Sequence, residues 1–295
     1  MKTPLFTGSN VAIVTPMHAD GSINFGKLGQ LIEFQIQGGT SAITICGTTG
    51  EASTLKDDEH LAAIKYTVET VAGRIPVIAG TGSNDTAHAI ELSKEAASYG
   101  ADGLLLVTPY YNKCTPKGLI QYFTMTVDAA GIPAIVYNVP SRTGVSMGVP
   151  VYRELSRHPL INGVKEASGD TELVLRTLAA CGDELNVWSG NDSQIVPFMA
   201  MGAKGVISVL ANIAPKETAE IAGACLTGDY QKAAEMQVQY MDLIDSLFCE
   251  VNPIPVKTAL NLMGQDVGPL RLPLCEMAQQ NLERLKGAMT AMKLL

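Results

Sequence analysis

Lys165 is the residue of this sequence best suited to covalent chemistry. It lies in Ile161–Glu166, a short apolar run that predicts a β-strand. Because side chains of a strand alternate between faces, Gly163 and the following Ala167 share the face of Lys165. If Val164 faces outward, Lys165 points into the core, where burial lowers the pKa of an amine. A neutral lysine can attack a ketone and form a Schiff base. The same pattern also fits a structural lysine paired with a buried carboxylate, or a strand shifted by one residue.

Tyr137 follows the same alternation in the preceding apolar run, Ile132–Asn138. Ile135 and Tyr137 share a face, so the phenol can project beside Lys165 from the neighbouring strand. A phenol at that place could carry protons during imine formation. The alternative is an aromatic side chain whose hydroxyl merely finds a partner in the core.

Two further segments are suited to holding a carboxylate. Gly47-Thr48-Thr49-Gly50 is a turn of small residues whose backbone N–H groups and two hydroxyls can bind an anion. Arg142 lies on a Pro- and Gly-containing loop, where its guanidinium could hold a carboxylate through two hydrogen bonds. Many loops resemble the first, and a solvated surface arginine is the alternative for the second.

Motifs for other chemistries do not appear. His18, His60, His88 and His158 are scattered and show no metal-binding spacing. There is no G-x-S-x-G nucleophile motif, no phosphate-binding P-loop and no complete dinucleotide fingerprint. We therefore expect a reaction that needs no metal and no bound cofactor.

Eight short apolar runs alternate with helix-like segments such as Phe25–Gln37, Lys56–Ala72, Asp85–Ser98 and Pro116–Ala129. The starts of the runs are roughly 28 residues apart, near the ~31 expected for eight βα units. This pattern predicts an α/β fold, a (β/α)8 TIM barrel, over a doubly wound open sheet, with the active site at the carboxyl ends of the strands. The predicted strands are Asn10–Thr15, Ser41–Cys46, Ile75–Ala79, Asp102–Thr108, Ile132–Asn138, Ile161–Glu166, Asn186–Ser189 and Lys204–Val209.

The alternation ends near residue 227, and the remaining segment is helical. Tyr230–Phe248, Ile254–Met263 and Leu274–Met292 are its predicted helices. A tail of this size is too small to fold well alone. We expect a catalytic barrel over residues 1–227 and a C-terminal helical domain over 228–295 that packs on it.

Composition excludes several classes of protein. The 295 residues are 46% hydrophobic and carry 29 acidic and 21 basic side chains, a formal net charge of −8. This balance disfavours binding to nucleic acid or to anionic lipid. No secretory signal, no membrane-spanning run and no paired-cysteine motif occurs, so we expect a cytoplasmic protein with reduced cysteines.

Taken together, the motifs at the predicted strand ends resemble those of the dihydrodipicolinate synthase family, pyruvate-dependent class I aldolases. The resemblance extends over nearly the whole chain, and this order and spacing are specific for the superfamily. The matching segments are Gly47-Thr48-Thr49-Gly50-Glu51, Tyr110-Tyr111-Asn112, Tyr137-Asn138-Val139-Pro140, Arg142-Thr143-Gly144, Gly163-Val164-Lys165-Glu166 and Ser189-Gly190-Asn191-Asp192.

The resemblance implies a lyase that condenses pyruvate with L-aspartate 4-semialdehyde in lysine and diaminopimelate biosynthesis. Lys165 would form the Schiff base and Tyr137 would transfer protons. Thr49 would link Tyr137 to Tyr111, which would reach into a neighbouring subunit's site. Thr48 and Thr49 would hold the pyruvate carboxylate.

The second substrate has its own implied residues. Arg142 would bind the carboxylate of the semialdehyde, while Gly190 and Ile207 would line the site through backbone groups. Arg142 also separates this interpretation from sister lyases of sialic acid or keto-deoxy sugar acids, which carry a nonpolar residue there. The family implies a homotetramer built as a dimer of dimers.

An effector site for lysine is implied at a dimer interface, on positions that include Ala52, His60, Asn84, His88 and Tyr110. Lysine-sensitive relatives carry a glutamate where this chain has His88. Since a carboxylate favours an ammonium group and an imidazole does not, we expect weak or absent inhibition by lysine.

Overall fold

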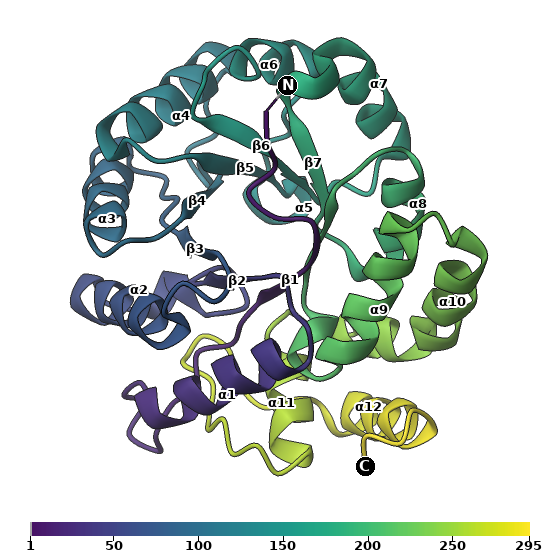
Figure 1. Cartoon of the computed structure of the whole chain (residues 1–295). Coiled ribbons are helices and arrows are strands. Elements are labelled where there is room, and N and C mark those ends of the chain that lie inside the picture. Colours follow the sequence, from purple (N-terminus) through teal and green to yellow (C-terminus); the bar gives the residue numbers. More distant parts are fainter. Residues whose placement is uncertain (1) are drawn as a thin grey trace.

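The eight apolar runs form parallel strands that close into one barrel in sequence order (Figure 1). The computed structural model describes residues 2–295. The predicted fold class is therefore confirmed, with every strand present. The strands are β1 (Gly8–Ala12), β2 (Ala42–Ile45), β3 (Val77–Gly80), β4 (Gly103–Val107), β5 (Ala134–Asn138), β6 (Ile161–Glu166), β7 (Asn186–Ser189) and β8 (Gly205–Ser208).

The first strand differs most from its prediction, because it starts at Gly8 and ends at Ala12. Gly8 pairs with Gly205 of β8, where a Cβ on Gly205 would lie only 1.9 Å from the Gly8 carbonyl oxygen. The N–H of Ile13 still donates to the Thr44 carbonyl of β2, but the next residue leaves the ladder, since the N–H of Val14 donates to Oδ1 of Asn212 at 3.1 Å.

The strands bury both faces, as expected for a parallel barrel surrounded by helices. One cluster, which contains Ile135, Tyr137 and Trp188, fills the interior of the barrel. A larger cluster, which contains Val136 and Val164, lies between the strands and the helices. Alternate residues of one strand therefore belong to different cores.

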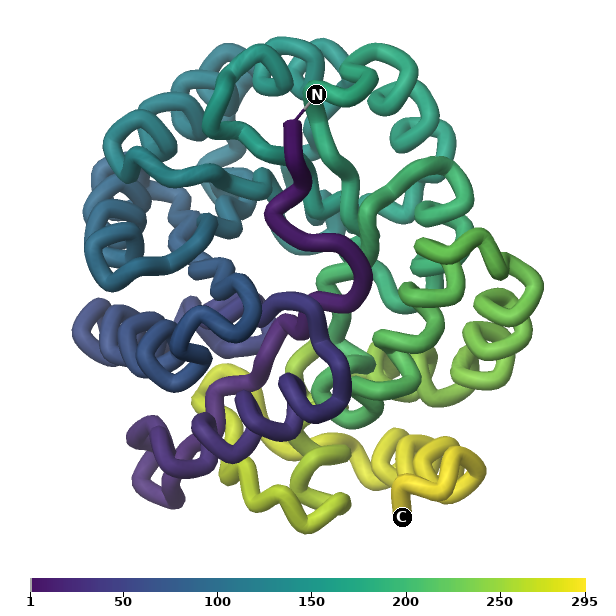
Figure 2. Tube along the Cα trace, viewed as in Figure 1, coloured from purple at the N-terminus to yellow at the C-terminus, as the bar shows by residue number. Residues whose placement is uncertain are grey.

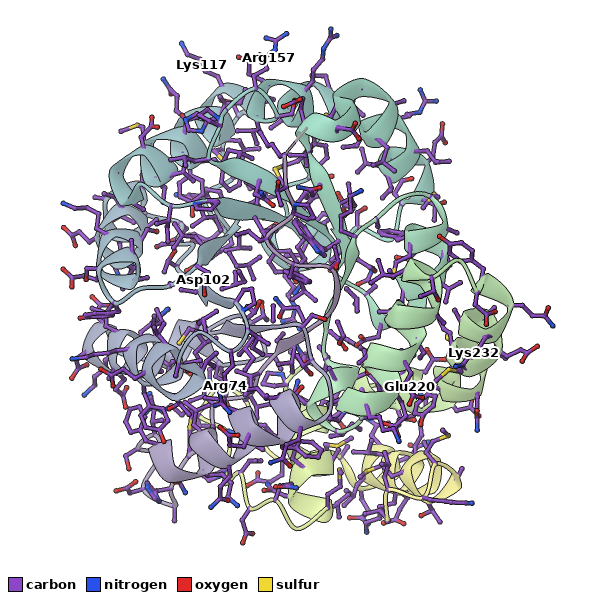
Figure 3. The ribbon with its side chains drawn as sticks, viewed as in Figure 1. Arg74, Asp102, Lys117, Arg157, Glu220 and Lys232 are labelled. Atoms are coloured by element: carbon purple, nitrogen blue, oxygen red, sulfur yellow. The ribbon has the colours of Figure 1, made fainter. Side chains whose placement is uncertain are left out.

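Helices surround the barrel as a ring (Figures 1 and 2). Side-chain caps begin several of them, as when the carboxylate of Asp170 accepts from the N–H of Leu173. Charged side chains such as Lys117 and Arg157 project outward from the ring (Figure 3). The ring contains α1 (Phe25–Gln37), α2 (Asp57–Val71), α3 (Thr86–Ser98), α4 (Pro116–Ala130), α6 (Val149–Leu155), α7 (Thr171–Cys181), α8 (Ile195–Ala200) and α9 (Pro215–Leu226), while the short α5 (Pro140–Thr143) lies inside it (Figure 1).

Three helices follow the barrel: α10 (Tyr230–Leu247), α11 (Ile254–Leu262) and α12 (Gln279–Ala291). The helix predicted to start at Leu274 starts at Gln279 instead. Ala278 is extended, with ψ of 140°, and its N–H donates to the Glu250 carboxylate at 2.9 Å. The preceding stretch is a loop that returns to the N-terminal part of the chain, where the N–H of Met17 donates to the Val267 carbonyl (Figure 2).

Candidate active site

Lys165 and Tyr137 lie side by side at the carboxyl ends of β6 and β5. The two residues are in register across the strands, and Nζ of Lys165 lies 4.3 Å from the centroid of the Tyr137 ring. Val164 belongs to the outer core and Tyr137 to the barrel interior, so the predicted alternation is confirmed. Lys165 is 6% exposed, and this burial lowers its pKa to about 8. The charge of Asp192 opposes the shift, and that of Arg142 reinforces it.

Asn138 and Glu166, which follow Tyr137 and Lys165 in the sequence, connect the ends of β5 and β6 on the outer face of the barrel. The Asn138 amide donates to both carboxylate oxygens of Glu166, at 3.0 and 3.1 Å. The hydroxyl of Tyr152 donates to Glu166 at 2.5 Å, and the N–H of Ser168 donates to it at 2.8 Å. This buried network lies on the outer face, and we infer that it keeps β5 and β6 in the register that pairs lysine with phenol.

Gly190, at the end of β7, leaves the room that Lys165 occupies. A Cβ there would lie 2.7 Å from the Ala167 Cβ and 3.1 Å from the Lys165 Cε. Its N–H donates to the Glu166 carbonyl at 2.8 Å. Ile207, the other predicted backbone contributor, lies deeper, with its side chain in the interior cluster.

Asp192 is a buried acid that the sequence analysis quoted but did not assign. Its Oδ2 accepts from the N–H groups of Val209 and Leu210, at 3.0 and 2.9 Å. Burial raises its pKa, while these hydrogen bonds and the charge of Lys165 lower it. A carboxylate held there favours the protonated form of Lys165 and sets a limit on how far burial lowers the pKa of the lysine.

A cavity of about 730 Å³ opens above the barrel and brings most of the predicted residues together. Its wall includes Lys165 and Tyr137, and it continues past Gly190 to the C-terminal extension. Thr48, Thr49 and Arg142 complete the predicted set around this cavity. Groups that react with a ketone and groups that hold carboxylates therefore share one space.

The two threonines have different partners. Burial raises the pKa of Tyr137 to about 12, against the effects of the Arg142 charge and a hydrogen bond with the Thr48 side chain. The hydroxyl of Thr49 instead accepts from the Asn252 amide at 3.0 Å. The hydrogen-bond partner of Tyr137 is thus Thr48, while Thr49, to which the resemblance assigned the link with Tyr111, is held by Asn252 of the extension.

Arg142 enters the cavity from the short helix α5. Its Nη2 donates to the main-chain carbonyl of Asn252 at 3.1 Å. The side chain is exposed and bonds to no carboxylate within residues 2–295, so its guanidinium remains available to an anionic ligand.

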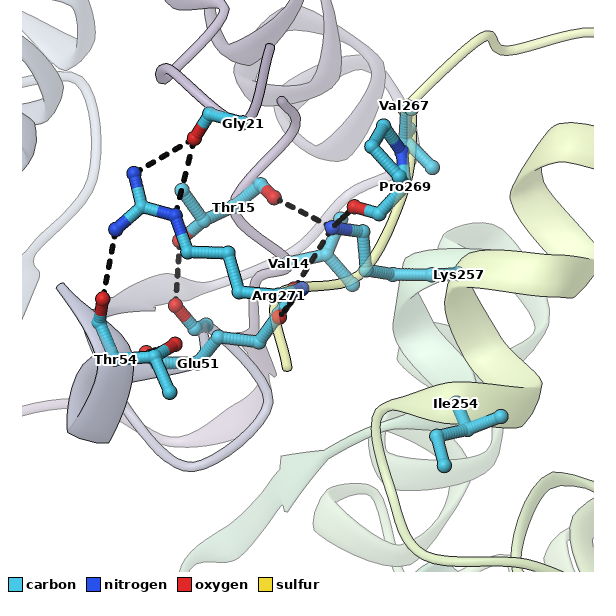
Figure 4. A network of polar contacts seen from close by, with 12 residues as sticks. Val14, Thr15, Gly21, Glu51, Thr54, Ile254, Lys257, Val267, Pro269 and Arg271 are labelled. Atoms are coloured by element: carbon cyan, nitrogen blue, oxygen red, sulfur yellow. Dashed lines mark hydrogen bonds and ion pairs between the residues drawn. The ribbon is translucent and has the colours of Figure 1, made fainter. Parts of the chain in front are cut away.

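A buried ion pair fixes the far end of the threonine loop (Figure 4). Nζ of Lys257 donates to the Glu51 carboxylate at 2.7 Å and to the carbonyls of Thr15 and Pro269. The other Glu51 oxygen accepts from the N–H of Arg271 at 2.9 Å. Both charged side chains of the pair are 1% exposed. The sequence analysis missed Lys257 and Arg271, since only their position in the fold connects them with the loop.

Tyr111 lies outside the cavity that contains Lys165. It is 89% exposed and has a φ of 72°, a left-handed conformation that is unusual for a tyrosine. The structure of one chain therefore places this phenol on the surface, beside Tyr110.

The five predicted effector residues gather in a second cavity of about 500 Å³, which Tyr137 and Arg142 also border. Nε2 of His88 lies 3.0 Å from the Asp57 carboxylate. His60 is buried with a ring nitrogen 2.7 Å from the Gly80 carbonyl, and burial lowers its pKa. Of the two acids that border this cavity, Asp57 is thus already adjacent to an imidazole, and Asp85 is the other.

Within residues 2–295, no three His, Cys, Asp or Glu side chains come together as a possible metal site. None of the helices in the same range combines the length and the apolar character needed to cross a bilayer.

A buried lysine beside a phenol, at the carboxyl end of a closed parallel barrel, defines a lyase of the Schiff-base-forming class I aldolase type. Comparison with known proteins narrows this class. The sequence profile of the Dihydrodipicolinate synthetase family matches residues 5–292, and the chain belongs to that family.

Individual relatives agree along nearly their full lengths. The 4-hydroxy-tetrahydrodipicolinate synthase of Thermoanaerobacter pseudethanolicus is 56% identical over 293 residues, covering 99% of this chain and 98% of its own. That of Caldicellulosiruptor saccharolyticus is 53% identical over 286 residues, covering 97% of each chain. The crystal structure of dihydrodipicolinate synthase from Acinetobacter baumannii, complexed with pyruvate, is 44% identical with a TM-score of 0.96, covering 98% of this chain and 99% of its own.

Proposed function

We propose that this protein condenses pyruvate with L-aspartate 4-semialdehyde to form 4-hydroxy-2,3,4,5-tetrahydrodipicolinate, a step of lysine and diaminopimelate biosynthesis. The observation that carries the proposal is the buried Lys165 amine lying 4.3 Å from the Tyr137 ring. The names of the relatives support the choice of reaction.

The reaction begins when the neutral amine of Lys165 attacks the keto carbon of pyruvate and water leaves, which gives an imine. The protonated imine withdraws electrons, so the methyl group loses a proton and an enamine forms. The enamine carbon attacks the aldehyde carbon of the semialdehyde, and the new alkoxide takes up a proton. The amino group of the product then attacks the former keto carbon, the bond to Lys165 breaks, and the ring closes.

Each of these steps moves a proton, which is the task that we assign to Tyr137. Its pKa of about 12 keeps the phenol neutral at physiological pH, so the hydroxyl can both accept and donate a proton. Thr48, its hydrogen-bond partner, extends the path toward the rim of the cavity. We place Tyr111 of a second subunit at the end of this path.

Both substrates carry a carboxylate, and the cavity offers two places for one. We assign the pyruvate carboxylate to Thr48 and Thr49 at the turn after β2. We assign the carboxylate of the semialdehyde to Arg142, with Gly190 on the wall of the cavity and Ile207 beneath it in the barrel interior. The reaction needs no metal and no cofactor in this scheme, since the imine itself supplies the electron sink.

The assembly belongs to the same proposal. The exposed Tyr111 requires a second subunit to reach a catalytic cavity, and a homotetramer built as a dimer of dimers supplies it. Within each subunit, the catalytic barrel of residues 1–227 carries a helical domain of residues 228–295, whose α10 contacts α8 and α9. The acidic surface and free cysteines suit a cytoplasmic enzyme.

The test is turnover of pyruvate and the semialdehyde, coupled to a reductase that consumes the product. Wild type should turn over, and Lys165→Ala should neither turn over nor be trapped with pyruvate by borohydride. Arg142→Ala should retain trapping but raise KM for the semialdehyde about 10- to 100-fold, since it loses a charge-assisted contact. Trapping on Lys165 without turnover of the semialdehyde would reassign the enzyme to another aldehyde.

A further inference from the structure

Asn252 is a residue of the C-terminal extension that reaches the catalytic cavity. It lies in the connection between α10 and α11, it is 5% exposed, and it borders the same cavity as Lys165. The mechanism above gives it no role, although it contacts two of the residues assigned to substrate carboxylates.

The direction of the hydrogen bond between Asn252 and Thr49 determines where the threonine proton can go. Nδ2 of Asn252 donates to Oγ1 of Thr49 at 3.0 Å. Because an amide N–H can only donate, Thr49 is the acceptor in this contact and its own O–H must point elsewhere. Among the described residues Thr49 donates its hydroxyl proton to no protein acceptor, so the proton remains available to a ligand in the cavity.

The main chain of the same residue holds Arg142. The Asn252 carbonyl accepts from Nη2 of Arg142 at 3.1 Å. One residue of the extension thus connects the turn after β2 with helix α5. The side-chain and main-chain contacts are chemically separate, so substitution of the side chain removes only the bond to Thr49.

The side chain of Asn252 also carries an uncompensated polar group. Its Oδ1 is buried and has no hydrogen-bond partner among residues 2–295. A buried carbonyl without a partner costs stability, and sites that keep such groups usually do so for function. The amide is therefore poorly explained as a device for stability alone.

We propose that Asn252 is a positioning residue that orients the hydroxyl proton of Thr49 toward the carboxylate of pyruvate. The inference rests on the proposed function, because it requires pyruvate to bind at Thr49. The amide occupies a lone pair of the threonine oxygen, and the hydroxyl then donates to the substrate in the same way in every turnover. No conformational search of the hydroxyl is needed when pyruvate arrives.

Two substitutions test the direction of this bond. Asn252→Ala removes the donor, and the pyruvate concentration for half-maximal borohydride trapping should rise about 2- to 10-fold, the range for one hydrogen bond. Asn252→Asp has nearly the same shape but reverses the polarity. The hydroxyl of Thr49 must then donate to the introduced carboxylate, and that negative charge repels the pyruvate carboxylate. At pH 8 this variant should need at least about 10-fold more pyruvate than wild type.

Steady-state kinetics and a matched control complete the experiment. KM for pyruvate should rise in both variants, while KM for the semialdehyde should change less than 2-fold, since the carbonyl that holds Arg142 remains. Gln279→Ala removes one amide hydrogen bond, to Glu283 within α12 and away from the cavity, and should leave both KM values unchanged. Melting temperatures should show all three variants folded.

The outcomes separate the inference from the proposed function. If wild type is trapped on Lys165 and Asn252→Asp binds pyruvate as well as wild type, Asn252 does not orient Thr49 and the inference is wrong. Equal rises in both KM values would indicate general loosening of the site and would also overturn it. If wild type itself is not trapped by pyruvate, the proposed function fails first.

Discussion

The ammonium group of Lys165 lies over the face of the Tyr137 ring, 4.3 Å from its centroid, inside a parallel barrel. A π face stabilises a cation, whereas burial among apolar side chains opposes it. Burial dominates here, since the pKa of Lys165 falls to about 8. The lysine is therefore close to the balance between its charged form and its nucleophilic form at physiological pH.

The pH dependence of Schiff-base formation follows from this pKa. At pH 7 about a tenth of Lys165 should be neutral, and the fraction should approach one above pH 9. We expect the rate of borohydride-trapped adduct formation with pyruvate to rise between pH 6 and 8 and to level off above pH 8.5. A midpoint near 10.5, the value of an exposed lysine, would show that burial does not tune this amine.

Stability should depend on the same group. The folded pKa of about 8 is below the unfolded value near 10.5, so folding is opposed by about 3 kcal/mol below pH 8. This penalty decreases as the pH rises from 8 to 10.5, because folding then releases a proton from the unfolded chain and higher pH favours that release. Lys165→Met should thus be more stable than wild type at pH 7, with an advantage that fades toward pH 10. Denaturant unfolding at several pH values measures it, and the exposed Lys117→Met is the control.

Loss of the phenol should affect proton transfer more than folding. Tyr137→Phe keeps the ring beneath Lys165 but removes the hydroxyl, so kcat should fall about 10²- to 10⁴-fold. The melting temperature should change little. Tyr122→Phe removes a buried hydroxyl that accepts from the N–H of Ser83, away from Lys165, and should retain wild-type kcat. Similar kcat values for the two variants would remove Tyr137 from the mechanism.

The buried Lys257–Glu51 pair should be costly to break on one side only. Lys257→Met leaves the Glu51 charge without its cation and should lower the free energy of unfolding by about 3–5 kcal/mol. Adding Glu51→Gln removes the isolated charge and should recover a large part of that loss. A double-mutant cycle by chemical denaturation measures the coupling, and additive losses would contradict a direct interaction.

Lysine should inhibit this enzyme weakly or not at all. The second cavity offers His88 beside Asp57, where a glutamate in sensitive relatives would bind the effector's ammonium group. We expect initial rates to remain near the uninhibited value in sub-millimolar lysine. His88→Glu restores a carboxylate and should increase the response, measured as the lysine concentration that halves the rate. Strong inhibition of wild type below 1 mM would refute this expectation.

Local patterns in the sequence determined the barrel and its central pair. Strand periodicity placed all eight strands, and the two-residue alternation put Lys165 inside once Val164 was assigned to the outer core. These predictions succeed because a strand exposes alternate side chains to opposite faces, whatever the rest of the chain does. Recognised motifs around the strand ends supplied Thr48, Thr49, Arg142 and Gly190 of the cavity, but not residues 248–252, which also border it.

The tertiary structure alone decided how the loops of the site are held. Asn252 meets Thr49 across 203 residues of sequence, and Lys257 meets Glu51 across 206. No local periodicity encodes such pairs, because they form only when the C-terminal helices pack against the barrel. The hydrogen-bond partner of Tyr137 also depends on the tertiary structure. Asn252 of the extension binds Thr49, and the Thr48 side chain bonds to the phenol.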